Sequence, residues 1–243
     1  MARDTEPLRR YFRECRDANT GDGLTYAAIS YYGTTTVAMG SYMHSPPVGA
    51  DDFDGQIRVG EFGYPPAWRE TYLRDRLHLI DPLARRAAKL ARPLFWSESR
   101  SLPDLTPEER RYLDRVSAEK LGEGLGIPVF GPAGRNGYVA LGFASPERPE
   151  ADEIIELQAA AQMGHLAYCR LLLKGLPRGV KLSAREREIL RWVARGRTNN
   201  QIADVLSLSR NTVETYIRRC FEKLDVNDRV SAALRGIALG MID

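Results

Sequence analysis

The first residues that could do chemistry are three aromatic side chains with polar tips, followed by a carboxylate. Tyr64, Trp68 and Tyr72 stand four residues apart, so they would share one face of a helix. Asp81 follows them, at a predicted helix start. A carboxylate on an apolar face needs a donor to bind, and the indole N–H and phenol O–H are themselves donors. The set suits a neutral ligand that carries carbonyls and an amide N–H.

These residues also have a simpler interpretation. Aromatic side chains at helical spacing usually pack in a core. Asp81 could do no more than cap the helix that follows it. Spacing alone favours this simpler interpretation over a ligand site, so the choice needs further information from the sequence.

A second set of polar residues lies on a predicted helix near the C-terminus. Its apolar residues are spaced by four, four and three and form one face: Val213, Ile217, Phe221 and Leu224. The opposite face carries hydrogen-bonding side chains: Arg210, Asn211, Glu214, Thr215 and Arg218. Arginine can pair with guanine, asparagine with adenine or a phosphate, and glutamate can accept from cytosine. This face could therefore read the major groove of DNA.

Other side chains of the same region are better placed for phosphates, which set affinity more than sequence choice: Arg197, Thr212, Arg219 and Lys223. The competing interpretation is a small helical bundle with a solvated face. In that case Glu214 and Arg218 merely form an i,i+4 ion pair. Periodicity alone favours DNA binding only slightly.

The elements around this helix predict a helix-turn-helix. Ser183 and Glu186 form a capping box at the start of one helix. Thr198 caps a second helix, and Ser209 caps a third after a short turn. A fourth helix is expected over Asp228–Leu239. This layout places one helix in the major groove.

The front part of the chain mixes helices and strands. Helices are predicted over Leu8–Ala18, Pro65–Arg76, Asp81–Leu90, Thr106–Lys120 and Ala151–Leu173. Strands are predicted over Leu24–Tyr32, Thr35–Met43, Gln56–Val59, Leu125–Phe130 and Gly137–Ala144. The fold class is therefore α+β, with an N-terminal α/β/α sandwich around an antiparallel sheet, followed by an all-α four-helix domain.

Composition and charge support two domains. The chain has 243 residues, of which 43% are hydrophobic and 28% charged, as in globular proteins. Residues 174–181 hold two glycines and a proline, and form the expected linker between domains at 1–173 and 182–243. Residues 1–173 carry 21 basic and 24 acidic side chains, and residues 174–243 carry 14 and 8. The basic C-terminal part indicates a module that binds a polyanion.

Several classes of protein are disfavoured. Cys15, Cys169 and Cys220 are far apart without CxxC spacing, and three scattered histidines do not predict a metal centre. The first ten residues lack the apolar core of a signal peptide, and no apolar run is long enough for a bilayer. We therefore expect a cytoplasmic protein with no membrane partner, no metal and no cofactor. No catalytic triad or carboxylate pair is recognisable, so an enzyme is not expected.

The C-terminal motifs resemble a known family. Leu182–Leu190 (LSAREREIL), Ala194–Gly196 (ARG), Asn200–Ala203 (NQIA), Ser209–Val213 (SRNTV) and Lys223–Leu224 keep the mutual spacing of the LuxR-type helix-turn-helix. The resemblance covers roughly 60 residues and implies binding to double-stranded DNA. The same module also follows phosphorylated receiver domains, so it does not identify what controls it.

The front part resembles the acyl-homoserine-lactone (autoinducer) binding domain of LuxR-type quorum-sensing receptors. The matching segments are Phe62–Tyr72 (FGYPPAWRETY), Ile80–Pro82 (IDP), Phe95–Trp96 and Gly124–Val129 (GLGIPV). The resemblance implies that Trp68 binds the lactone carbonyl, Tyr64 the acyl carbonyl and Asp81 the amide N–H. By the same resemblance Tyr72 and Trp96 line the pocket and Gly124 is structural.

Three positions depart from the family pattern. Many members have Thr or Ser where this chain has Ala140, and that hydroxyl helps to hold the acyl carbonyl or a 3-oxo group. Leu83 and Gly126 also stand where some relatives have a hydroxyl. The departures predict a ligand without a 3-oxo substituent, with a short, branched or aryl acyl group.

The leading hypothesis is a transcriptional regulator controlled by an acyl-homoserine lactone. We expect a homodimer, formed through Ala151–Leu173 and the C-terminal helix, on a two-fold symmetric DNA site, with RNA polymerase as a further candidate partner. The alternatives are a solo receptor for a non-lactone or foreign signal, and an apo-active repressor that ligand releases.

A response regulator is disfavoured because the front part lacks the alternation of a receiver, although an Asp51-Asp52-Asp54 cluster is present. An enzyme that acts on the lactone is disfavoured too.

Overall fold

The structure is a computed structural model that describes residues 4–50, 59–77, 80–175 and 181–243. The chain divides into two compact units, and each is described by itself. The first comprises Met1–Ser45, Ile57–Gly131 and Asn136–Leu171, and the second Pro46–Gln56, Pro132–Arg135 and Leu172–Asp243. The Asp51-Asp52-Asp54 cluster and the start of the strand predicted over Gln56–Val59 lie outside the described residues.

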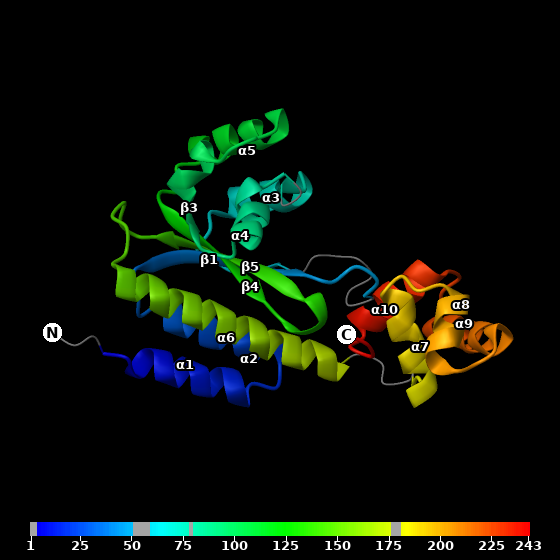
Figure 1. Cartoon of the computed structure of the whole chain (residues 1–243). Helices are drawn as coiled ribbons and strands as arrows, with labels where there is room; N and C mark the ends of the chain where they lie inside the picture. Colours follow the sequence, from blue (N-terminus) through cyan, green and yellow to red (C-terminus); the bar gives the residue numbers. More distant parts are fainter. Residues whose placement is uncertain (1–3, 51–58, 78–79, 176–180) are drawn as a thin grey trace. The chain divides into compact units, whose positions relative to one another are not determined.

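A five-stranded antiparallel sheet forms the middle layer of the first unit (Figure 1). Its strands are β1 (Val37–Ser45), β2 (Val59–Phe62), β3 (Leu94–Phe95), β4 (Gly124–Phe130) and β5 (Asn136–Phe143), in the order β2-β1-β5-β4-β3. The register pairs Ser41 with Ala140 and Gly126 with Ala140. Both β4 and β5 are buried along almost their whole length, because helices cover the two faces of the sheet.

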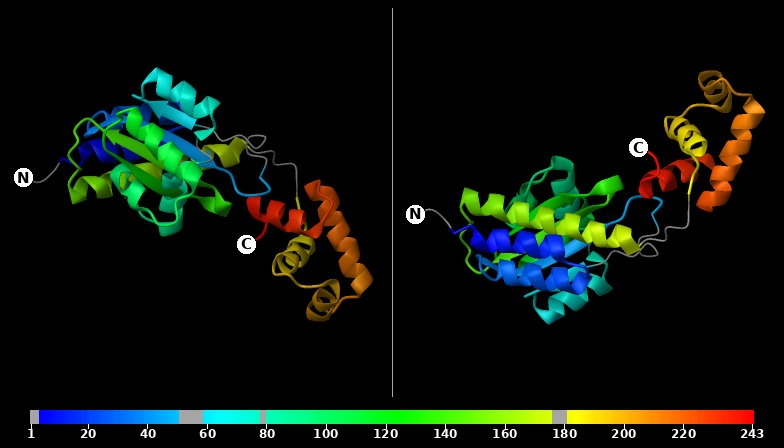
Figure 2. Two further views of the ribbon diagram at one scale, coloured as in Figure 1. Left: turned by 90° about the horizontal axis from the view of Figure 1, so that it is seen from above. Right: turned by 90° about the horizontal axis from the view of Figure 1, so that it is seen from below.

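Three helices cover one face of the sheet: α1 (Glu6–Asp17), α2 (Gly21–Tyr32) and α6 (Ala151–Gly175). The view from below in Figure 2 shows α6 lying along α1 and α2. The core on this side joins sheet residues such as Ile127 and Leu141 to Leu157 of α6. Helix α6 extends to Gly175, so the first two residues of the expected linker are helical.

The prediction of a strand over Leu24–Tyr32 is wrong, because this segment forms most of α2. Thr20 caps the helix by accepting a hydrogen bond from the Gly23 N–H. Leu24, Ala27 and Tyr31 are buried at the spacing of a helix face. Tertiary packing therefore overrides the strand preference of the Tyr, Thr and Ile residues in this segment.

The other face of the sheet is covered by α3 (Pro66–Arg74), α4 (Pro82–Leu90), α5 (Pro107–Ala118) and the 3-10 helix η2 (Trp96–Ser101). Figure 1 shows α3, α4 and α5 together on the side of the sheet away from α6. The predicted α/β/α sandwich is confirmed. The short strand β3 and η2, which follow α4, were not predicted.

The second unit contains α7 (Ala184–Ala194), α8 (Asn199–Leu206), α9 (Arg210–Leu224) and α10 (Arg229–Ala238), with the short 3-10 turn η3 (Pro132–Gly134). Capping boxes start α7 at Ser183 and α8 at Thr198, and Ser209 caps α9. The predicted four-helix domain with its helix-turn-helix is confirmed. Within the described ranges, none of the helices combines the length and apolar character needed to cross a membrane.

Candidate functional site

A small cavity on the α3–α5 side of the sheet gathers most of the predicted ligand-binding residues. Its volume is about 80 Å³. The predicted residues that line it are Tyr64, Trp68, Tyr72, Asp81, Leu83, Trp96 and Ala140. The volume is below the ~300 Å³ at the lower end of ligand sites, so a ligand has to widen this cavity as it enters.

Asp81 caps α4 and also faces the cavity. Its Oδ1 accepts a hydrogen bond of 2.9 Å from the Leu83 N–H, and its Oδ2 lies 3.4 Å from the Tyr72 hydroxyl, which donates to it. The Tyr112 hydroxyl is a further donor. The two interpretations of Asp81 are therefore compatible, since one carboxylate oxygen caps the helix while the other lies beside Tyr72.

The electrostatics of Asp81 follow from its burial, because only 7% of the residue is exposed. Burial raises the pKa of Asp81, and the hydrogen bonds from Leu83, Tyr112 and Tyr72 offset only part of that rise. A further N–H donor in the cavity would favour the charged carboxylate, since hydrogen bonds to a carboxylate lower its pKa.

Two hydroxyl side chains that line the cavity, Ser41 and Tyr138, were not predicted from the sequence. Ser41 of β1 forms a hydrogen bond with the Tyr64 side chain. Tyr138 of β5 is 6% exposed, and its hydroxyl has no hydrogen-bond partner among the described residues. A buried hydroxyl without a partner costs roughly 1–3 kcal/mol, so Tyr138 is a donor that a ligand carbonyl would satisfy. The alternation of side chains along a strand would place both hydroxyls on the cavity side of the sheet, but only once the registers of β1 and β5 are known.

Glycines on β4 make room for the aromatic wall. Gly126 does not line the cavity, because the Tyr138 ring and hydroxyl lie directly over it and leave no space for a Cβ. A Cβ at Gly124 would overlap the ring of Trp96. Tyr138 therefore reaches across from the neighbouring strand and occupies the space over Gly126.

A larger cavity, of about 360 Å³, lies on the opposite face of the sheet between β1, α2 and α6. Its lining includes Leu24, Tyr32, Tyr42, His165 and Tyr168. The smaller cavity differs from it in holding the predicted set of Tyr64, Trp68 and Asp81.

The predicted DNA-reading residues lie on α9, the third helix of the second unit. Asn211, Glu214 and Arg218 are exposed, and Thr215 is half-buried with its hydroxyl donating to the Asn211 carbonyl at 2.9 Å. Arg218 has its ion pair with Glu222, at 3.9 Å, and the i,i+4 pair with Glu214 is not formed. Long exposed ion pairs contribute little, so the Arg218 guanidinium is available to a base edge.

These four residues line a surface groove of about 630 Å³, together with Asn199 of α8 and Arg229 of α10. Arg229 was missed, because the sequence pattern places it at the start of a different helix. Its guanidinium donates to the Arg197 carbonyl. Of the predicted phosphate contacts, Arg197 and Arg219 are exposed, and Thr212 is bound to Ser209 with 2.8 Å between hydroxyls.

Lys223 forms a structural ion pair that was not predicted from the sequence. Its Nζ lies 2.7 Å from Oε2 of Glu186, which is 3% exposed and closes the capping box of α7. Burial acts to raise the pKa of Glu186, but the hydrogen bonds from Lys223 and Ser183 outweigh it and leave that pKa lowered. The lysine therefore joins α9 to the start of α7.

The comparisons with known proteins agree with both units. Residues 32–168 match the family described as "Autoinducer binding domain", and residues 180–235 match "Bacterial regulatory proteins, luxR family". A putative HTH-type transcriptional regulator, y4qH of Sinorhizobium fredii, is 34% identical over 74% of this chain and 56% of its own length. The chain thus spans little more than half of that relative. RpaR, a quorum sensing-dependent regulator of Rhodopseudomonas palustris, is 28% identical over 74% of this chain and 73% of its own.

Solved structures show the same fold. Escherichia coli SdiA superposes with a TM-score of 0.71 at 23% identity, over 96% of this chain and 97% of its own. A second structure, of SdiA in complex with octanoyl-rac-glycerol, has a TM-score of 0.69. Sensory domain and helix-turn-helix together define the class: a small-molecule-binding, DNA-binding regulator of transcription and not an enzyme. The chain belongs to the LuxR family of autoinducer-binding quorum-sensing regulators.

Proposed function

We propose that this chain senses an N-acyl-homoserine lactone without a 3-oxo group and, as a homodimer, binds a two-fold symmetric site on double-stranded DNA to control target promoters. The observation that carries the ligand part is the convergence of Asp81, Tyr64, Trp68 and Tyr138 on one buried cavity. Lactone ligands offer a matching set of one amide N–H and two carbonyls. No cofactor is part of this proposal.

Each polar group of the ligand has one proposed partner. Asp81 accepts from the amide N–H, Trp68 donates to the lactone carbonyl, and Tyr64 donates to the acyl carbonyl, as in the family resemblance. Tyr138 adds a second donor beside Tyr64, and its hydroxyl interacts electrostatically with Asp81 and Tyr64. Tyr72, Trp96 and Leu83 supply the apolar wall.

Two features support a short acyl chain without a 3-oxo group. Ala140, which is 9% exposed, faces the cavity with a methyl group where a hydroxyl could bind a 3-oxo oxygen. The cavity of about 80 Å³ has to widen for any lactone, and a longer acyl chain would require more rearrangement of the core. A short, branched or aryl acyl group meets both conditions.

The dimer and its DNA contacts are proposed from exposed side chains. Helix α6 exposes Ile155 and Leu166, and α10 exposes Val230, Leu234 and Ile237. Apolar side chains on two helices suit a symmetric interface. In each protomer α9 would enter the major groove, where Arg218, Asn211, Glu214 and Thr215 meet base edges and Arg197, Thr212 and Arg219 meet phosphates. RNA polymerase is a further proposed partner, and residues 174–181 the proposed linker.

The test is a melting-temperature panel on the full chain with acyl-homoserine lactones that differ in chain length, branching, aryl group and 3-oxo substitution. A ligand that binds only the folded state raises stability. We expect strong stabilisation by a lactone without a 3-oxo group, lost in Asp81→Asn. Octanoyl-rac-glycerol belongs in the panel because SdiA is solved with it. A preference for 3-oxo lactones would refute that part of the proposal, and indifference to every lactone would point to a solo receptor.

DNA binding is tested separately by footprinting with and without the stabilising lactone. A two-fold symmetric footprint supports the dimer, whereas a single half-site contradicts it. Binding that appears only with ligand identifies ligand-dependent DNA binding. Binding that ligand abolishes identifies an apo-active repressor, the alternative mode of control.

A further inference from the structure

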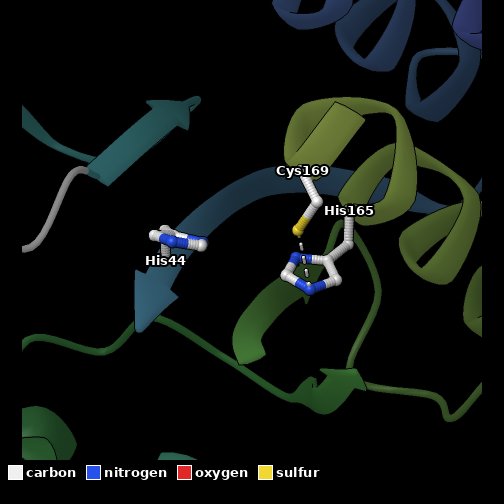
Figure 3. A group of neighbouring side chains, drawn as sticks. All are labelled: His44, His165 and Cys169. Atoms are coloured by element: carbon white, nitrogen blue, oxygen red, sulfur yellow. Dashed lines mark hydrogen bonds between the residues drawn. The ribbon is translucent and has the colours of Figure 1, made fainter. Parts of the chain in front are cut away.

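Two histidines and a cysteine that are distant in the sequence meet in the core of the first unit (Figure 3). His44 lies on β1, and His165 and Cys169 lie on successive turns of α6. All three are almost fully buried, with exposures of 0%, 1% and 0%. One ligand atom from each lies within 4.8 Å of those of the other two.

The backbone explains why these side chains meet. Residues four apart on a helix share a face, so His165 and Cys169 both point from α6 toward the sheet. Alternate residues of a strand share a face, so His44 lies on the same side of β1 as Tyr42. Gly137 of β5 leaves room for the imidazole, because a Cβ there would stand 3.1 Å from Nδ1 of His165.

Hydrogen bonds already orient the cluster. The Tyr42 hydroxyl lies 2.9 Å from Nδ1 of His165 and 3.4 Å from Nδ1 of His44. Nε2 of His165 faces Sγ of Cys169 at 3.5 Å. An imidazole whose Nδ1 is held by an oxygen and whose Nε2 faces a thiol has the arrangement seen around protein-bound metals, where the second nitrogen is fixed by an outer partner.

We propose that His44, His165 and Cys169 bind a thiophilic metal ion, and that copper(I) is the ion the site favours. Two imidazoles and one thiolate are the ligands that copper(I) and zinc share. On binding, the Cys169 thiol loses its proton to solvent as the sulfur–metal bond forms. This proposal does not rest on the proposed lactone function.

Charge and ligand number favour copper(I) over zinc. Copper(I) and one thiolate sum to zero charge, whereas a divalent ion would leave one positive charge in the core. Zinc prefers four ligands, and the cluster offers three among the described residues. Tyr42 is not counted as a fourth ligand, because its hydroxyl lies 2.9 Å from Nδ1 of His165 and so acts as the outer partner of that imidazole.

The geometry is close to a bound state. Metal–ligand bonds of about 2.0–2.3 Å place the ligand atoms of a three-coordinate site about 3.5–4 Å apart. The most distant pair, at up to 4.8 Å, would close by roughly 1 Å, which side-chain rotation supplies. The lining of the cavity of about 360 Å³ includes Tyr42 and His165 and also the exposed residues Asp22 and Thr25, so it offers an entry route.

The experiment titrates the reduced 243-residue chain with copper(I) under anaerobic conditions, in competition with a chromophoric copper(I) chelator, and in parallel with zinc. We expect one copper(I) per chain, zinc bound more weakly, and a rise in melting temperature on loading. Cys169→Ser and His44→Gln should each weaken copper(I) binding by more than about tenfold, since loss of an outer partner alone costs about that. Cys15→Ser, a buried thiol of the same unit outside the cluster, is the matched control and should bind normally.

Circular dichroism establishes that each variant is folded. X-ray absorption of the copper-loaded wild-type chain gives a second measurement that needs no variant, and one sulfur with two nitrogen ligands is expected. Absence of a bound metal, or binding that survives Cys169→Ser and disappears in Cys15→Ser, would overturn the site. Tighter binding of zinc than of copper(I) would overturn the assignment of the ion.

Discussion

Replacement of Tyr138 by phenylalanine should change stability and ligand affinity in opposite directions. The Tyr138 hydroxyl is buried in the ligand cavity and has no hydrogen-bond partner among the described residues. Such a group costs about 1–3 kcal/mol. Its removal leaves the ring that covers Gly126 in place, so Tyr138→Phe should stabilise the ligand-free protein by about that amount. For a unit of this size each kcal/mol raises the melting temperature by about 2–4 °C.

The bound state should respond in the other direction. If Tyr138 donates to the acyl carbonyl, the variant loses one neutral hydrogen bond, worth about 0.5–1.5 kcal/mol. Affinity compares the bound state with the free state, which the variant stabilises, so the lactone should bind at least about two- to tenfold more weakly. The assay is a thermal melt of wild type and variant with and without ligand, followed by calorimetric titration. The ligand-induced shift should be smaller in the variant although its starting melting temperature is higher.

Tyr112→Phe is the matched control, because its hydroxyl already donates to Asp81. That variant should lower the stability of the ligand-free protein, since it removes a satisfied bond from a buried carboxylate. An unchanged melting temperature in Tyr138→Phe would mean that the hydroxyl is satisfied in solution. Unchanged lactone affinity would refute its role as a donor to the ligand.

Three further predictions concern other parts of the chain. Asp81→Asn keeps an oxygen to cap α4 but presents an N–H to the ligand amide. We expect a lower melting temperature without ligand, because the Tyr72 and Tyr112 hydroxyls lose their carboxylate acceptor, and at least about a tenfold loss of lactone affinity by titration. Arg218→Ala should relax the base preference at one position of the DNA site. Arg219→Ala should lower the affinity for all DNA sequences alike and reduce its salt dependence, which binding at several salt concentrations measures. Lys223→Met should lower the free energy of unfolding by about 1–2 kcal/mol at neutral pH. This is less than the loss of a fully buried ion pair would cost, because the lysine side chain is 41% exposed. Because the lowered pKa of Glu186 favours its charged form in the wild type, that deficit should narrow as the pH falls through this lowered pKa. A constant deficit in melts across pH would contradict the ion pair.

Capping residues explain why the second unit was predictable from sequence. Ser183, Thr198 and Ser209 each accept a hydrogen bond from a backbone N–H of the helix that they start, and each contact depends on residues close in the chain. Local chemistry of this kind can be recognised without knowledge of tertiary structure. The exposed face of α9 followed from the same periodicity.

The first unit was less predictable because its decisive contacts are non-local. Tyr31 reads as a strand residue, yet its ring stacks on Tyr11 of α1 at 5.0 Å and lies within α2. Tyr138 reaches the ligand cavity only because β5 pairs with β4 in a register that places Gly126 beneath it. The sequence predicted most of the candidate ligand residues through a family resemblance. A hydroxyl that reaches the cavity from a neighbouring strand cannot be predicted from the sequence unless the strand pairing is known.

Strand β1 connects the two proposed sites, because its alternate residues face opposite sides of the sheet. Ser41 and Met43 line the ligand cavity, while His44 is a proposed metal ligand and Tyr42 forms hydrogen bonds with His44 and His165. A metal that fixes the second pair restricts the backbone that presents the first pair, so occupancy of one site should alter the affinity of the other. By linkage the change must be reciprocal: the factor by which copper(I) alters lactone affinity must equal the factor by which lactone alters copper(I) affinity. Calorimetric titration of each ligand with the other present measures both factors, and Cys169→Ser should abolish the effect. Equal affinities in all titrations would show that β1 is rigid enough to keep the two sites independent.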